Sequence, residues 1–349
     1  MNKVTFYFIL LIATAALFSC SKDDPAPTIV PPRDYAEQYK VDIAVIEDYL
    51  NTYYLDMDLT NPNFADKDVV ITKIPVGGTQ PSLMSYSTAT TTYPRLLSRI
   101  VNLHDVPYKL YYLVLREGVG TSPCNVDSVL ASYRGDYLEP IAATASTATS
   151  TNAVKFEEMK FPQTFFDLPN TIVGWGEIFP KFKSGTYTSN PDGTLTHKDF
   201  GAGVMFLPSG LAYYNTGSNS IPSYSPLVFS FKLYEMKRLD QENNGISLTP
   251  DGIPSYLEDL DGDGYVYDFR NTVRYPTPPE EKIRYADDTD KDGIPDFLDV
   301  DDDGDLYTTK LEITNPATGL VYPFALIPDC SGNFTNPARI KKHLDKACH

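Results

Sequence analysis

The chain has 349 residues, a formal net charge of -17 and a sequence pI near 4.6. Nucleic acid is excluded as an expected partner, because phosphate backbones are bound by clustered Lys and Arg side chains. The length exceeds one ordinary domain, so we expect two or three units. Residues 251–305 contain 18 acidic and five basic residues, which is 13 of the 17 excess negative charges. The negative charge is therefore concentrated in one segment.

The first residues have the pattern of an export signal. Lys3 precedes an apolar run, Val4–Phe18, that is too short to be read as a membrane span. The run ends at Ser19-Cys20, which resembles the lipobox of bacterial lipoproteins. We therefore expect residues 1–19 to be a lipoprotein signal peptide and Cys20 to be lipidated. An ordinary secretory peptide or a transmembrane anchor is the alternative.

The residues after Cys20 indicate a location and a tether. Ser21–Asp24 resembles the export signal of Bacteroidota lipoproteins, so we expect an outer-membrane lipoprotein on the cell-surface leaflet; the periplasmic leaflet is the alternative. Four prolines lie between Ser21 and Asp34 and favour an extended polyproline conformation. Residues 20–34 are accordingly expected to be a lipidated tether.

Residues 35–106 are expected to form an N-terminal extension. Apolar residues recur every three or four positions from Tyr35 to Tyr54, which predicts an amphipathic helix with a packing role. A strand is expected at Val69–Ile74. The rest of residues 55–105 has no functional pattern.

Strand patterns dominate from Lys109 to Leu239. Lys109–Leu115 opens this region, and Leu227–Tyr234 alternates apolar and polar residues, as in a half-buried strand. Two segments interrupt it and are expected to be surface loops, residues 141–153 and 188–201.

A set of short motifs in this region resembles the FKBP-type peptidyl-prolyl isomerases. The motifs are Ala131–Gly135, Thr171–Glu177, Phe206–Pro208, Leu211–Tyr213 and Ile221–Phe229, in the order of that family. The resemblance covers about residues 107–239. It implies an α+β fold in which a bent antiparallel sheet wraps around a short helix that begins near Trp175, with Pro180 close to its first turn.

The resemblance also implies an apolar site for a proline ring. Trp175 would form its floor and Tyr213 would direct its hydroxyl at a bound carbonyl, while Glu157 stands where the family usually has Asp. The remaining residues carried over are the walls Tyr133, Phe156 and Phe229 and the edges Ile172 and Ile221. Taken singly, each aromatic residue could equally be an ordinary core residue.

Such a site explains catalysis without a nucleophile. The barrier to rotation of an Xaa-Pro amide, about 18–20 kcal/mol, comes from resonance that favours the planar, polar form. A dry aromatic site binds the twisted amide better. We therefore expect a prolyl isomerase that acts on proline-containing polypeptides, as a folding helper for exported or outer-membrane proteins. The alternatives are a non-catalytic binding subunit of an outer-membrane protein complex and a glycan-binding lipoprotein.

Residues 240–310 carry alternating carboxylates and resemble the calcium repeats of thrombospondin type 3. Carboxylates two residues apart in a loop that bends at glycine can direct several oxygens at one calcium ion. Asp251-Gly-Ile-Pro recurs at Asp292, which indicates a repeated unit; a disordered acidic linker is the alternative. The expected structural calcium ligands are Asp261, Asp263, Asp288, Asp290, Asp292, Asp296, Asp299, Asp301 and Asp303.

Three cysteines remain besides Cys20. Cys330 and Cys348 would close a short loop in the C-terminal segment, residues 311–349, so they are the expected disulfide and Cys124 the free thiol. A metal site of Cys330, Cys348 and His349 is the alternative, although it lacks the spacing of known zinc motifs.

Overall fold

The computed structural model describes residues 31–144, 149–242 and 247–348. The expected signal peptide, Cys20 and most of the expected tether lie outside these ranges, as does His349. The elements below belong to one compact unit, Asp34–His349. Among its described helices, none combines the length and the apolar character needed to cross a membrane.

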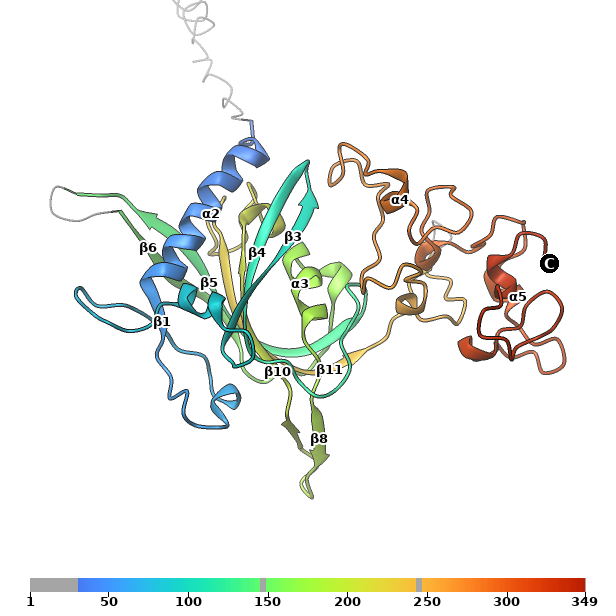
Figure 1. Ribbon diagram of the computed structural model, residues 1–349, viewed down its shortest axis with the longest axis horizontal. Coiled ribbons are helices and arrows are strands. Elements are labelled where there is room, and N and C mark those ends of the chain that lie inside the picture. Colours follow the sequence, from blue (N-terminus) through green and yellow to red (C-terminus); the bar gives the residue numbers. More distant parts are fainter. Residues whose placement is uncertain (1–30, 145–148, 243–246, 349) are drawn as a thin grey trace, which may run out of the picture. The chain divides into compact units, whose positions relative to one another are not determined.

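The main sheet is antiparallel, with its long strands in the order β3-β4-β10-β11-β5-β6 and the short β7 paired with β5 (Figure 1). The strands are β3 (Arg95–Leu103), β4 (Val106–Arg116), β5 (Ser128–Ile141), β6 (Ser150–Met159), β7 (Phe166–Asp167), β10 (Gly201–Leu207) and β11 (Leu227–Lys237).

Both faces of the sheet are covered by protein. In strand β10, for example, all seven residues are buried. Met205 and Leu207 pack in one core with the short helix α3, Val173–Ile178. Val204 and Phe206 pack in a second core on the opposite face. Alternate side chains along a strand point to opposite faces, so each face receives its own apolar set.

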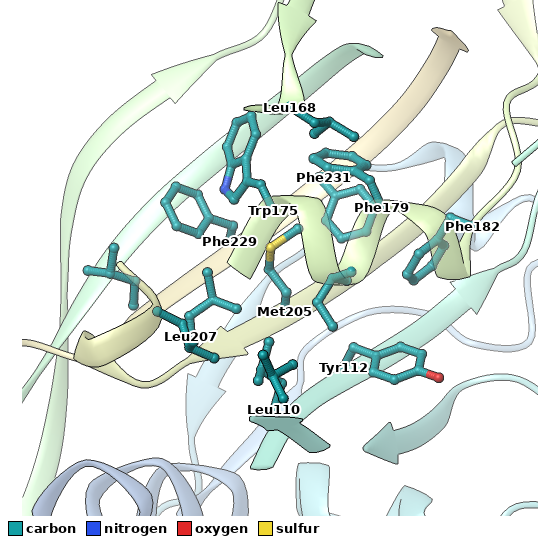
Figure 2. Close-up of a cluster of buried hydrophobic side chains, with 14 of the residues drawn as sticks. Leu110, Tyr112, Leu168, Trp175, Phe179, Phe182, Met205, Leu207, Phe229 and Phe231 are labelled. Carbon is teal, nitrogen blue, oxygen red and sulfur yellow. The ribbon is translucent and has the colours of Figure 1, made fainter. Parts of the chain in front are cut away.

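The first core contains side chains of α3 and of the sheet strands, several of which are drawn in Figure 2. Leu227, Phe229, Phe231 and Leu233 of β11 all belong to it, as the alternating pattern predicted. The expected α+β arrangement, a bent antiparallel sheet around a short helix, is therefore present. Helix α3 begins at Val173 and ends before Pro180, which lies in the following 3₁₀ turn, so the expectation that Pro180 sits in the first turn was wrong.

The second core lies under the N-terminal helix α2, Tyr35–Thr52. The sequence pattern predicted this helix, and the structure confirms it. Asp34 caps the helix by accepting a hydrogen bond from the Glu37 amide. The buried Asp42 fixes the helix to the domain that contains the main sheet, which we call the sheet domain. Its Oδ2 accepts hydrogen bonds of 2.7 Å from both the amide and the hydroxyl of Ser209.

Several parts of the sequence interpretation need correction. Strand β3 was not predicted, so the sheet begins at Arg95 and the expected boundary at residue 107 falls inside β4. The expected strand at Val69–Ile74 is shorter, β2 (Ile71–Lys73), and pairs with β1 (Tyr53–Leu55). Strands extend into both expected loops: β5 and β6 cover Ile141 and residues 150–153, and β8 (Thr186–Ser189) pairs with β9 (Leu195–Lys198).

Residues 240–349 form the tail, and its described part contains two short α-helices, α4 (Glu281–Arg284) and α5 (Thr309–Glu312). Its two Asp-Gly-Ile-Pro copies share one backbone form. Gly252 and Gly293 have positive φ angles of 112° and 98°, and a 3₁₀ turn follows each proline, at Ser255–Leu257 and Asp296–Leu298. The structure joins Cys330 to Cys348 by a disulfide.

The tail packs against the sheet domain at α3. The Glu177 carboxylate is 3% exposed and pairs with Arg99, at 2.9 Å, while the Tyr267 hydroxyl lies 3.2 Å from each of its oxygens. The Tyr265 hydroxyl donates to the Glu177 carbonyl. Beside this contact the free Cys124, 5% exposed, lies in a small apolar cluster with Val126, Val266 and Phe297.

Candidate functional sites

Trp175 lies at the centre of an aromatic cluster at the start of α3. Its ring meets four other rings edge to face, with centroid distances of 5.1 Å to Tyr133, 5.6 Å to Phe166, 5.3 Å to Phe179 and 5.4 Å to Phe229. The Trp175 and Phe229 side chains are buried, whereas Tyr133 and Phe166 are half-buried. The cluster therefore combines a buried indole with two rings that are partly exposed to solvent, those of Tyr133 and Phe166.

The indole N–H of Trp175 is buried and has no hydrogen-bond partner in the described part of the chain. Figure 2 shows this nitrogen on the side of the ring nearest Phe229. Buried donors in native proteins are nearly always satisfied. A bound acceptor, from a ligand or from water, would complete the site.

Phe156 joins the cluster through an irregularity in strand β6. The pairing of β5 with β6 shifts between Gly135 and Asp136, which face Glu157 and Lys155, so Phe156 has no partner of its own. Such a bulge redirects a side chain. The Phe156 ring packs edge to face on Phe229 at 5.7 Å and covers Gly135, where an added Cβ would lie 2.4 Å from it.

Tyr213 and Ile221 are positioned by the loop that precedes β11. Ser218 and Ile221 exchange two backbone hydrogen bonds, of 3.1 Å and 2.7 Å, which close a tight turn. Ile221 is thereby buried in the first core, and the half-buried Tyr213 packs against the same core. Ile172, the residue before α3, is half-buried there as well.

Glu157 is exposed and its charge acts on both tyrosines of the site. Burial, together with a hydrogen bond to Glu157 and its charge, raises the pKa of Tyr133. Burial and the same carboxylate also raise the pKa of Tyr213. Both phenols therefore remain protonated at neutral pH and can act as hydrogen-bond donors.

Seven of the eight carried-over residues thus belong to the first core or pack against it, and the eighth, Glu157, lies beside Tyr133 and Tyr213. Phe166 was missed by the sequence interpretation, although it touches both Tyr133 and Trp175. Its signal was the pair Phe165-Phe166 just before the helix. It reaches the cluster because Phe166 pairs with Val129 across the β7–β5 ladder.

Three loops of the tail each bring three carboxylates together. In each loop one oxygen from every acid lies within 4.8 Å of the others, so one cation at the usual calcium–oxygen distance of about 2.3–2.6 Å could contact all three. Backbone amides hold these carboxylates; the two oxygens of Asp288, for example, accept from Lys291 and Gly293. The groups are Asp259, Asp261 and Asp263; Asp288, Asp290 and Asp292; and Asp301, Asp303 and Asp305.

A further carboxylate faces each loop. Burial and nearby aspartates raise the pKa of Asp287 beside Asp259 and Asp261 to about 7, and that of Asp299 beside Asp290 and Asp292 to about 6. Glu312, 4% exposed and without hydrogen-bond partners for its side-chain oxygens among the described residues, faces the third loop, and its pKa rises to about 8. Uncompensated buried carboxylates of this kind fit a bound cation.

Asp296, a predicted ligand, belongs to none of these three groups, although its pKa is raised by burial and by the charges of Asp288 and Asp299, which lie nearby. Its two oxygens accept hydrogen bonds from the amide and the hydroxyl of Thr289, at 2.8 Å and 2.7 Å, and so hold the loop. Asp259, Asp287, Asp305 and Glu312 were missed as candidates. The two-residue spacing could have indicated Asp259 and Asp305.

Residues 249–337 match the protein family described as BamM C-terminal. Among solved structures, the chain is similar to a peptidyl-prolyl cis-trans isomerase from Pseudomonas syringae pv. tomato, with 18% identity, a TM-score of 0.28, and coverage of 44% of this chain and 88% of that one.

It is also similar to FkpA from Escherichia coli, with 22% identity, a TM-score of 0.28, and coverage of 44% and 56%. A third similarity is to the N-terminal domain of FKBP42 from Arabidopsis thaliana, with 17% identity, a TM-score of 0.26, and coverage of 37% and 86%. No curated protein sequence matches the chain.

Proposed function

We propose that the aromatic cluster around Trp175 binds a proline-containing segment and accelerates its cis/trans isomerisation. The observation that supports this most is the enclosure of one indole ring by aromatic rings, two of which, Tyr133 and Phe166, are partly exposed to solvent. A proline ring stacked there would leave water, and Tyr213, protonated and half-buried, would donate to a neighbouring carbonyl.

The difference in solvation of the amide between water and the cluster explains how rotation would be accelerated. Water stabilises the planar, charge-separated amide, whereas an apolar surface does not, so transfer to the cluster lowers the barrier to rotation. The indole N–H of Trp175 and the Tyr213 hydroxyl would hold the peptide while the amide twists. No proton is transferred and no covalent bond forms.

Replacing Tyr213 by phenylalanine is expected to reduce the acceleration of prolyl isomerisation about fivefold, because a neutral hydrogen bond contributes about 1 kcal/mol. Trp175→Ala should reduce it further. The full protein is used, since β3 completes the sheet. Isomerisation of a short Xaa-Pro peptide is followed by NMR exchange.

The matched control is Tyr187→Phe, which removes a hydroxyl from an exposed strand outside the cluster and should leave the rate unchanged. Equal rates with and without the wild-type protein would overturn the isomerase proposal. Binding of the same peptide without acceleration would favour the second candidate, a non-catalytic binding subunit.

That second candidate is supported by the match of residues 249–337 to the BamM C-terminal family, which is consistent with an outer-membrane protein complex. We propose for either function that Cys20 carries a lipid that anchors the protein to the outer membrane, with the cell-surface leaflet as the expected location. Its partners would be exported or outer-membrane polypeptides. Globomycin sensitivity of its processing, and the mass of its N-terminal peptide, test the lipid anchor.

We also propose that the three acidic loops bind calcium as a structural ion. Calcium would neutralise the clustered carboxylates, which otherwise repel one another in a partly buried setting. The residues proposed to hold it are Asp259, Asp261, Asp263 and Asp287; Asp288, Asp290, Asp292 and Asp299; and Asp301, Asp303, Asp305 and Glu312.

A further inference from the structure

A fourth group of carboxylates lies where the chain leaves strand β11. One oxygen from each of Asp240, Glu242 and Asp251 lies within 4.8 Å of the others. Glu242 is fully buried and Asp251 is 3% exposed. The expected calcium ligands did not include these residues, and they lie outside the three acidic loops.

Each of the three acids uses one oxygen within the protein and leaves the other free. Asp240 Oδ2 accepts from the Gly252 amide at 3.0 Å, Glu242 Oε2 from the Asp251 amide at 3.2 Å, and Asp251 Oδ1 from the Ile253 amide at 2.6 Å. The remaining oxygens, Asp240 Oδ1, Glu242 Oε1 and Asp251 Oδ2, are buried without a hydrogen-bond partner in the described ranges. The backbone thus fixes a set of free oxygens.

Glu258 provides an independent indication of a cation. Its side chain is 3% exposed, and neither carboxylate oxygen has a hydrogen-bond partner among the described residues. Burial raises its pKa, and so do the charges of three carboxylates, Asp302, Glu242 and Asp251, two of which belong to this group. Lys310 lies nearby, but its ammonium donates to the Pro250 carbonyl at 2.8 Å. A single lysine would not balance four carboxylates.

The spacing of this group recurs in the tail. Glu242 and Asp251 follow Asp240 by two and eleven positions, as Asp290 and Asp299 follow Asp288, and as Asp303 and Glu312 follow Asp301. These are the first, third and twelfth positions of calcium-binding loops of the EF-hand type, where the twelfth residue closes the coordination sphere. Three segments of the chain therefore share one pattern of ligands.

We propose that Asp240, Glu242, Asp251 and Glu258 bind one divalent cation of the calcium class, which fixes the start of the tail to the end of β11. This inference rests on the calcium binding proposed for the tail. The site is well placed for such a role, because Arg238 pairs with the buried Asp127, Leu239 donates to the same carboxylate, and the Ser255 amide donates to the Leu239 carbonyl. The ion would thus connect two parts of the protein.

The number of calcium ions bound per chain tests the site. Equilibrium dialysis of the full protein against calcium should show that Glu242→Gln binds one ion fewer than the wild type, whereas Asp192→Asn, in the exposed β8–β9 turn, binds the full number. Asp290→Asn should lose an ion from a different loop. An undiminished number in Glu242→Gln, beside a loss in Asp290→Asn, would overturn this site alone. A wild-type protein that binds none would overturn all calcium sites and leave the isomerase proposal standing.

Glu258→Gln gives a test that does not depend on a folded Glu242 variant. Removing a buried negative charge should raise the melting temperature in chelator, because repulsion is relieved, and should shrink the increase that calcium produces. A purely structural Glu258 would not give these opposite changes. If the substitution raised the melting temperature equally with and without calcium, the cation would not interact with Glu258, and the proposal would be overturned.

Discussion

Chelation of calcium is expected to make the tail the first part of the protein that a protease cuts, at sites between Asp251 and Asp305. Without a cation, the three acidic loops hold carboxylates within 4.8 Å of one another. Their repulsion opposes the packed form. A ligand at 100 times its dissociation constant stabilises the state that binds it by about 2.7 kcal/mol per site, so several ions would change the tail more than any single substitution.

Limited proteolysis with calcium and with chelator, analysed by mass spectrometry, locates the cuts. Asp292→Ala and Asp301→Ala should make the same region labile even in calcium, and Asp192→Ala, in the exposed β8–β9 turn, should not. The sheet domain should respond little, because its aromatic cluster contains no carboxylate group of this kind among the described residues. Cleavage that is indifferent to chelator would mean that the acidic repeats do not depend on calcium.

Replacement of Phe179 by alanine is expected to lower the free energy of unfolding by about 3–5 kcal/mol. The Phe179 side chain is fully buried and packs against Trp175 at 5.3 Å and Phe231 at 4.8 Å, so its removal leaves a cavity between α3 and the sheet. Urea unfolding can be followed by the fluorescence of Trp175, the single tryptophan of the chain.

Phe161→Ala is the matched control, because that side chain is 79% exposed and its loss should change the stability by less than about 0.5 kcal/mol. The same two variants, measured for isomerisation as well, distinguish a loss of core packing from a loss of activity. If Phe179→Ala and Phe161→Ala unfold at the same urea concentration, the core is not centred where α3 meets β11.

The features that local patterns encode were predicted from the sequence. Helix α2 follows from its apolar period, and the face of β11 that carries Phe229 and Phe231 follows from alternation. The carried-over residues of the aromatic cluster were predicted from the order of the FKBP-like motifs. Strand β3 was missed because Arg95–Leu103 mixes polar and charged residues with apolar ones, and its pairing with β4 is what makes it a strand.

The acidic groups likewise contain some residues that local sequence patterns predict and others that only the fold brings together. Alternating aspartates in one loop are visible in the sequence, so most carboxylates of the groups at Asp288 and Asp301 were predicted as ligands. Asp287 reaches the Asp259 loop, and Glu258 reaches Glu242, only through the fold of the tail. Tertiary packing brings their side chains near these carboxylates, which no local spacing indicates.

Cys124 has a consequence for the thiol chemistry of a protein that also carries the Cys330–Cys348 disulfide. Exchange begins with attack by a thiolate, and burial raises the pKa of the Cys124 thiol to about 12. While Val266 and Phe297 cover it, this cysteine is neither ionised nor accessible, so it cannot rearrange the disulfide. A tail that detaches would expose the thiol, and its alkylation by a maleimide would then measure how often the two parts separate.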